Sequence, residues 1–302
     1  LDAAAALGYR PHVAARALAG ASAHALALLV PELTNPVYST IIRGAFAQAR
    51  VRGYTVMVAE DFDEQEADES FGNLVAAGHV DGILMASARS GHPVVEGLAR
   101  QGIPHVFVNR AVEGSGRNVT MNVAAASVLV VERLAGLGHE LIGHVSGPRG
   151  LETGRTRALA FTAAAERLGV RDAPISHTSF DERGGAAGAA ELLEHDPRLT
   201  AIYASSLSQA VGVVHAVRGR GLRIPEDVSV IAYDDLPLAE FLVPPLDTVA
   251  MPLIELGSTA VDALVEQVGG APPQDLVIPT APRLVLRGSS AEPVRSAEAA
   301  AR

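Results

Sequence analysis

The chain contains no cysteine among its 302 residues. This absence excludes disulfide bonds and any metal site built from thiolates, and it fits a protein of a reducing compartment. The sequence also lacks a run of about 18 apolar residues, the length that a membrane-spanning helix needs. Its first residues, Leu1–Gly8, do not show the basic region and apolar core of a secretion signal. We therefore expect a protein of the cytoplasm.

Basic residues are scarce, with 24 Lys and Arg against 34 Asp and Glu and a formal net charge of -10. Contact with nucleic-acid phosphates needs clustered Lys and Arg, so the acidic body should bind DNA poorly by itself. Common enzyme motifs are missing too: there is neither a Gly-x-x-x-x-Gly-Lys loop nor a Gly-x-Ser-x-Gly elbow. His139 and His144 resemble a zinc-protease pair, but their spacing corresponds to about 500° of helical rotation, which separates them. We expect no catalytic site, metal or cofactor.

Apolar residues are abundant, at 48% hydrophobic positions, and they fall into short runs that alternate with amphipathic stretches. Such alternation predicts parallel sheets with helices on both faces. More than six strand–helix units are a large number for a single sheet, so we expect two sheets. The predicted strands are 25–30, 55–59, 82–86, 105–109, 141–146, 201–204 and 228–233, and the predicted helices include 40–52, 65–77, 124–137, 155–168 and 209–220.

The most informative stretch follows Arg223. Residues 228–233 form an apolar run suited to a buried parallel strand, and the run stops at two adjacent carboxylates, Asp234 and Asp235. In open α/β sheets, ligands bind outside the carboxyl ends of the strands, which is where Asp234 should lie. The alternative is that one of the two carboxylates only caps a helix that starts near Leu236.

Several short segments, in this order and spacing, resemble the LacI/GalR family of bacterial transcription regulators over roughly residues 1–290. The segments are Leu7-Gly8-Tyr9-Arg10-Pro11, Ala14-Ala15-Arg16-Ala17-Leu18, Leu29-Val30-Pro31-Glu32-Leu33-Thr34-Asn35-Pro36, Val80-Asp81-Gly82-Ile83-Leu84, Gly138-His139, Gly147-Pro148 and 227–249. The resemblance implies a core of two doubly wound parallel-sheet lobes, like type I periplasmic binding proteins, with a ligand cleft between them.

The resemblance also implies the domain boundaries. Residues 1–24 would be the end of a DNA-binding headpiece and a hinge segment, most of the helix-turn-helix being absent from the sequence. Residues 25–137 and 253–280 would form the N-terminal lobe, residues 138–252 and 281–290 the C-terminal lobe, and 291–302 a disordered tail. In the hinge, Leu18 matches a family residue that wedges into the minor groove, and Arg16 one that contacts the DNA. Without DNA, this short segment should be disordered.

Matching positions place the effector site. Val37 and Tyr38 follow the Asn-Pro that starts a helix, where an aromatic ring can stack on a sugar or base. Arg157 matches the family's effector-binding arginine, Thr153 a polar pocket position, and Asp234 an acceptor for sugar hydroxyls. The alternatives are core packing for Val37, a surface helix position for Arg157, and a phosphate-cradling loop over residues 147–157.

Other positions depart from the family pattern. Ser206 and Leu207 replace a common Asn-Asp pair, Met121-Asn122 replaces Asp-Asn, and Leu253 stands where an aromatic is sometimes found. These changes make the expected pocket less polar than a typical sugar site, although Ser206 could still donate a hydrogen bond. Asn109 and Arg110 end a strand on the same side and are further candidates.

Together these features predict a ligand-responsive repressor that acts as a homodimer on operator DNA. Its effector is expected to be a sugar or related polyol whose binding closes the lobes and changes the pairing of the hinge segments. The alternatives are a solute-binding protein of a sugar transporter, which would share the two-lobed core, and a cleft enzyme acting on a small sugar. The hinge match and the missing secretion signal favour the repressor.

Overall fold

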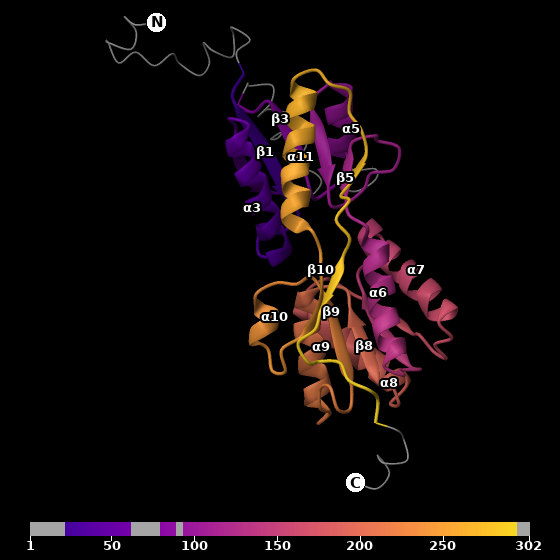
Figure 1. The fold of residues 1–302 in the computed structure, drawn as a ribbon. Helices are drawn as coiled ribbons and strands as arrows, with labels where there is room; N and C mark the ends of the chain where they lie inside the picture. Colours follow the sequence, from indigo (N-terminus) through magenta and orange to yellow (C-terminus); the bar gives the residue numbers. More distant parts are fainter. Residues whose placement is uncertain (1–21, 62–78, 89–92, 295–302) are drawn as a thin grey trace, which may run out of the picture. The chain divides into compact units, whose positions relative to one another are not determined.

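The computed structural model of the chain describes residues 22–61, 79–88 and 93–294. These residues divide into two compact units (Figure 1). The N-terminal unit consists of the described residues up to Thr120 together with Leu253–Ile278. The C-terminal unit consists of Met121–Pro252 and the described residues from Pro279 onward. No helix within the described ranges is long and apolar enough to cross a membrane.

The N-terminal unit is built on one six-stranded sheet whose strand pairs are all parallel. Its central strands are apolar on both faces, as a sheet covered by helices on both sides requires. In spatial order, the strands are β11 (Leu276–Val277), β5 (Asn118–Thr120), β4 (His105–Val108), β3 (Gly82–Met85), β1 (Ala25–Val30) and β2 (Thr55–Glu60), and the described helices are α3 (Pro36–Val51), α5 (Pro93–Arg100) and α11 (Leu253–Val268).

Helix α3 begins at the Asn-Pro pair, four residues before the predicted bound at residue 40. The Asn35 side chain accepts a hydrogen bond from the backbone N–H of Val37, and Pro36 occupies the first turn, where its missing N–H costs nothing. The backbones of α3 and α11 touch where the two helices cross. A Cβ added to Gly257 on α11 would lie only 2.1 Å from the carbonyl oxygen of Ile41 on α3. Figure 1 shows the two helices side by side. The crossing joins the early and late segments of this unit.

The C-terminal unit holds a second six-stranded sheet, parallel except for its last strand, β12, which pairs antiparallel with β10. The spatial order is β12 (Arg283–Val285), β10 (Asp247–Ala250), β9 (Ser229–Tyr233), β8 (Ala201–Ala204), β6 (Ile142–Ser146) and β7 (Ile175–His177). Its helices are α6 (Val123–Gly136), α7 (Glu152–Arg167), α8 (Glu182–His195), α9 (Leu207–Gly219) and the single turn α10 (Leu238–Phe241).

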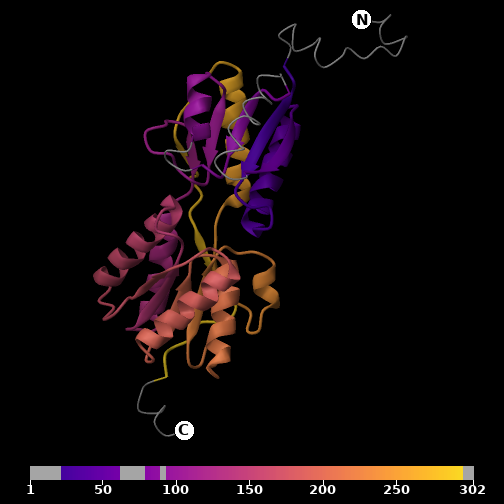
Figure 2. The ribbon, with the colours of Figure 1, turned by 180° about the vertical axis from the view of Figure 1, so that it is seen from behind.

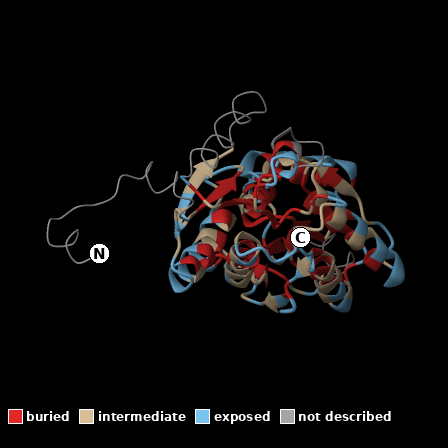
Figure 3. Cartoon of the chain, turned by 90° about the horizontal axis from the view of Figure 1, so that it is seen from above, coloured by how far each residue is buried: buried red, intermediate tan, exposed pale blue. Residues whose placement is uncertain are grey.

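Helices cover both faces of this second sheet. Side chains of α6 and α7 pack with alternate strand residues, including Tyr203, Ile231 and Tyr233, in one buried apolar cluster. On the opposite face, α8 packs so closely on β6 that a Cβ on Gly188 would lie 2.8 Å from the Val145 side chain. Figure 2 shows this side from behind, and Figure 3 shows buried residues in red on the strands and exposed residues in pale blue on outer helix turns.

The predicted fold class, two doubly wound parallel-sheet lobes, is confirmed. The boundary predicted after residue 137 is wrong, because α6 belongs to the C-terminal unit: Val130 and Leu134 pack against the core of the second sheet. The predicted disordered tail also starts too early. The backbone of Ala291 exchanges hydrogen bonds with the hydroxyl of Ser229, so the chain is still fixed there. The predicted helix 65–77, the hinge residues Arg16 and Leu18 and residues 295–302 lie outside the described ranges.

Candidate functional site

Arg157 lies on α7, beside the carboxyl ends of β8 and β9, and only 7% of its surface is exposed. One guanidinium nitrogen, Nη1, donates to the carbonyl oxygen of Ser205 at 2.6 Å. The carbon Cζ stands 3.5 Å from the ring centroid of Tyr233 and 5.7 Å from that of Phe180. Among the described residues, Nε has no hydrogen-bond partner, and no carboxylate forms an ion pair with Arg157. Burial contradicts the alternative of a surface helix position.

Asp234 directly follows β9 and is 3% exposed. Its backbone has a φ of 75°, a left-handed conformation that Asp tolerates better than most residues. Burial raises the pKa of the Asp234 carboxyl to about 6, and the positive charge of Arg157 opposes the rise. Within the described part of the chain, no group donates a hydrogen bond to this carboxylate, so its acceptor oxygens are available to a ligand.

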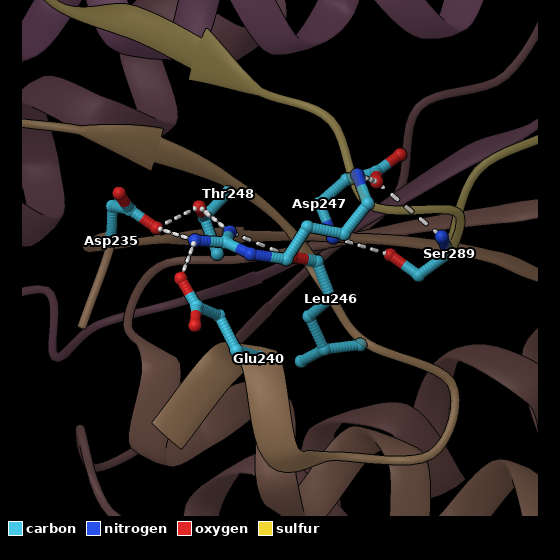
Figure 4. Close-up of polar contacts among 7 residues, drawn as sticks. Asp235, Glu240, Leu246, Asp247, Thr248 and Ser289 are labelled. Atoms are coloured by element: carbon cyan, nitrogen blue, oxygen red, sulfur yellow. Dashed lines mark hydrogen bonds and ion pairs between the residues drawn. The ribbon is translucent and has the colours of Figure 1, made fainter. Parts of the chain in front are cut away.

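The neighbouring carboxylate has a different role. Asp235 accepts hydrogen bonds from the Thr248 hydroxyl at 2.8 Å and from the Arg287 guanidinium at 2.6 Å. The same guanidinium lies 3.6 Å from Glu240 on α10 and donates to the Leu246 carbonyl oxygen. Figure 4 shows Asp235, Thr248 and Glu240 converging on this contact. Asp235 is thus bound inside the unit and fixes the turn that carries Asp234.

Neither carboxylate caps the following helix. The residue at the start of α10 is Pro237, and no side chain makes a capping hydrogen bond there. The alternative explanation of the Asp234-Asp235 pair is therefore contradicted, and the ligand interpretation of Asp234 remains.

Thr153 and Ser206, the two other site residues predicted in this unit, differ in whether their position leaves them available to a ligand. Thr153 is buried in the first turn of α7, four residues before Arg157 and so on the same helix face. The Ser206 hydroxyl, in contrast, caps α9: it accepts from the backbone N–H of Gln209 and donates to the carbonyl oxygen of Phe180, both at 3.0 Å. Because its single hydrogen is used internally, Ser206 is not available to donate to a ligand.

In the N-terminal unit, the predicted residues lie near the carboxyl ends of its strands. Tyr38 is buried, and its hydroxyl accepts a hydrogen bond from Arg110 at 3.3 Å. Asn109 follows β4 with a φ of 70°, next to Arg110. Val37 is half-buried in the first turn of α3, and Leu253 is buried at the start of α11. The structure thus brings Tyr38 and Asn109 to the same sheet edge through Arg110, and all four residues stay predictions as ligand contacts.

Comparison with known proteins places this chain and its fold in a family. A model of the periplasmic binding protein-like domain matches residues 131–290. The ribose operon repressor of Escherichia coli K12 is 31% identical over 289 residues, covering 94% of this chain and 87% of the repressor. The regulator MalR of Streptomyces coelicolor is 31% identical over 277 residues, covering 87% of this chain and 80% of MalR. The chain belongs to the LacI/GalR family of transcriptional regulators.

Solved structures of LacI-family regulators agree. A regulator from Mycobacterium smegmatis superposes with a TM-score of 0.82 at 26% identity, covering 89% of this chain and all of that one. The CelR–cellobiose complex gives 0.82 at 27% identity over 96% of this chain and 89% of CelR. A regulator from Enterococcus faecium with bound ribose gives 0.77 at 27% identity over 89% and 99% of the two chains.

Sequence reasoning missed two aromatic side chains of this regulator's site, Phe180 and Tyr233. Phe180 precedes α8, and its ring occupies the space above Gly147, where a Cβ would lie 2.0 Å from the ring. It was missed because β7, the strand before it, has only three residues and gives no periodic pattern. Tyr233 was assigned to a strand but not to the site. The signal for it is its position immediately before Asp234 at the strand end.

His144 belongs to the core of the regulator. Its ring is fully buried and stacks on Tyr203, with ring centroids 4.5 Å apart, and on Phe161 at 4.8 Å. Burial lowers the pKa of His144 to about 3, so the imidazole is neutral at physiological pH. The described residues hold no group of three or more His, Cys, Asp or Glu that could bind a metal ion.

Proposed function

We propose that this regulator is a repressor whose C-terminal unit binds a sugar through Arg157 and Asp234. The observation that carries the proposal is a buried guanidinium without an ion-pair partner among the described residues, beside a buried carboxylate that accepts no hydrogen bond from them. A polyol satisfies both groups, because a hydroxyl accepts from the guanidinium and donates to the carboxylate. Both groups lie at the strand ends where α/β proteins bind ligands.

The surroundings of this pair suit a sugar ring. Phe180 is partly exposed and lies beside Arg157, so that its face can cover the apolar face of a pyranose or furanose. The ionised form of Asp234 accepts hydroxyl hydrogens, and a pKa of about 6 leaves it ionised at neutral pH. The hydroxyl donors of a bound sugar would stabilise that form further.

A pentose is the first sugar to test. Several relatives are named ribose operon repressors, and one similar regulator was crystallised with ribose. Another similar regulator holds cellobiose, a disaccharide. We therefore propose D-ribose as the first probe and cellobiose as its comparison.

We propose that the sugar controls operator binding in the bacterial cytoplasm and leaves the protein unchanged. The test fuses the DNA-binding domain of the E. coli ribose operon repressor to this chain and measures a reporter behind that repressor's operator. The expected result is repression that changes on addition of D-ribose in the parent fusion but not in its Arg157→Ala variant. Repression that is indifferent to every sugar tested would reject the proposal. Nuclear magnetic resonance of the ribose after incubation should show no product, since a regulator returns its ligand intact.

We further propose that the regulator is a homodimer that uses the surface around α10. Leu238, Phe241 and Val243 expose apolar side chains within six residues, and Phe241 is 78% exposed. Such a cluster favours contact with a second copy. Phe241→Asp is therefore expected to shift the mass measured by light scattering from dimer to monomer. The control is Leu159→Asp on α7, an apolar residue that is 65% exposed and lies outside the α10 cluster, and it should leave the dimer intact. A dimer that survives Phe241→Asp would exclude this surface.

A further inference from the structure

A buried guanidinium normally needs a carboxylate to hold its charge and fix its plane. Arg157 has no carboxylate ion-pair partner among the described residues, and one hydrogen bond to the Ser205 carbonyl oxygen does not define the orientation of a planar group. The nearer of its two aromatic contacts is the face of Tyr233, 3.5 Å from Cζ, against 5.7 Å for Phe180. At the shorter distance the guanidinium lies directly on the ring, where the negative face of an aromatic attracts a cation.

The ring of Tyr233 is a rigid support. It is fully buried on β9, which is paired with β8 on one side and β10 on the other. Phe161, Val249 and Leu284 pack in the same cluster. The Tyr233 hydroxyl is buried and also lies close enough to Arg157 to interact with it. Because the ring face and the hydroxyl both lie near the guanidinium, separate substitutions are needed to distinguish their effects.

We propose that Tyr233 is a positioning residue: its ring face fixes the plane of the Arg157 guanidinium, whose buried Nε has no hydrogen-bond partner among the described residues, and so sets the direction in which Arg157 presents its donors to a ligand. This inference rests on the proposed sugar site, and it assigns one task to each of three consecutive residues. Tyr233 orients the donor, Asp234 supplies the acceptor and Asp235 fixes the turn. The contact also explains a requirement for arginine at position 157, since the ammonium of a lysine lacks a plane that can stack on the ring.

The first test needs no ligand. The ring current of Tyr233 shifts the nuclear magnetic resonance signal of a proton above the ring upfield. The Nε–H signal of Arg157 should therefore lie upfield of the Nε–H signals of the other arginines. Its absence from the spectrum of Arg157→Lys assigns it. Tyr233→Phe keeps the ring and should preserve the shift, whereas Tyr233→Leu should abolish it. Tyr203→Leu removes a neighbouring buried ring that stacks on His144, and it is the matched control that should preserve the shift. An unchanged Arg157 signal in Tyr233→Leu would overturn the proposal.

The second test is a double-mutant cycle on D-ribose affinity, measured by calorimetry. Tyr233→Leu is expected to weaken binding about tenfold, and Tyr233→Phe less than about twofold. In the Arg157→Ala background, Tyr233→Leu should cause no further loss, because its effect passes through Arg157. Additive losses would show that Tyr233 acts on the site through packing alone and would reject the positioning role. If the parent chain does not bind ribose, the proposed sugar fails, and the resonance shift still decides the role of Tyr233.

Discussion

At the scale of single residues, the most consequential group is the Asp234 carboxyl, which is buried and which the proposed sugar site uses in its ionised form. Its pKa of about 6 compares with 3.8 for the unperturbed group. A difference of about two pKa units corresponds to about 3 kcal/mol of folding free energy at neutral pH. The site therefore reduces the stability of the free protein, which a bound polyol would restore.

Asp234→Asn should stabilise the protein at pH 7.5 by up to about 3 kcal/mol while removing sugar binding. Asparagine keeps the shape and accepts the left-handed backbone, but it carries no charge to desolvate. Urea denaturation at pH 7.5 measures the change. A less stable variant would show that the Asp234 carboxylate is satisfied in the free protein, against the contacts described here.

Asp234 and His144 should also have opposite effects on stability as a function of pH. Between about pH 6 and 4, the folded state binds a proton at Asp234 that the unfolded state lacks, so acidification stabilises the fold. Burial lowers the pKa of His144 to about 3, so in the same window the unfolded state binds the extra proton and acidification destabilises the fold. His105 and His139, whose pKa values are also lowered by burial, act in the same direction as His144.

The free energy of unfolding of Asp234→Asn should therefore fall more steeply than that of the parent chain between pH 6 and 4. Urea denaturation at several pH values measures both slopes. Parallel curves for the two proteins would mean that Asp234 titrates at its ordinary value.

Two site residues were predicted from motifs that fix their place in the chain. Arg157 follows a Gly-Pro loop and Asp234 follows a strand, the structure buries both, and their role as ligand contacts stays a prediction. Ser206 was predicted as a donor, but the cap of α9 uses its hydroxyl, a local bond that sequence position does not reveal. Phe180 was missed because it follows a strand too short to recognise.

At the scale of elements, Arg287 ties the end of the chain to the ligand turn. It joins Asp235, which follows β9, and Thr248, which lies within β10, to the segment that follows β12, and both partners of the Arg287–Asp235 ion pair are mostly buried. Arg287→Met should lower the free energy of unfolding by about 3 kcal/mol, because it leaves Asp235 without its counter-charge. Ribose affinity should fall as well, because the Asp234 turn loses its anchor.

The control for this prediction is Glu240→Gln. Glu240 is 64% exposed and lies 3.6 Å from the same guanidinium, so its loss should cost less than about 1 kcal/mol. Thermal unfolding and calorimetry of both variants measure the difference. Equal effects of Arg287→Met and Glu240→Gln would contradict the anchoring role of the Asp235 pair.

The crossing of α3 and α11 gives a second element-scale prediction. Gly257→Ala should destabilise the protein by about 1–3 kcal/mol, because a Cβ 2.1 Å from the Ile41 carbonyl oxygen forces the helices apart. Gly136→Ala is the matched control: it also lies in a helix, but its Cβ meets nothing within 4 Å. That substitution should be neutral or stabilising. Thermal unfolding that ranks the two variants the other way would exclude a tight crossing.

The sequence predicted the longer strands and missed the short ones. The predicted bounds of β1 and β8 match the observed bounds, and those of five other strands agree within one or two residues. The strands β5, β7 and β11 have only two or three residues, too few for alternation to appear. Helix α6 was recognised but given to the wrong unit, because an apolar face does not reveal which sheet it covers.

At the scale of the whole molecule, family membership and charge determine how the regulator can work. The chain carries a formal net charge of -10, which repels DNA phosphates overall, so we expect attraction to DNA to need a locally basic segment. The sugar can change operator occupancy only by the difference in its affinity for two states of the protein. A coupling of about 1–3 kcal/mol, typical of such proteins, changes occupancy about 5- to 150-fold.

The measurement that tests the central claim most directly is calorimetric titration of this chain with D-ribose at pH 7.5. We expect saturable binding that Arg157→Ala and Asp234→Asn each reduce at least tenfold. Arg155→Ala, an exposed position on the same helix, should bind as the parent does. Binding that survives both site substitutions would place the sugar elsewhere. No binding of ribose or cellobiose would contradict the sugar assignment.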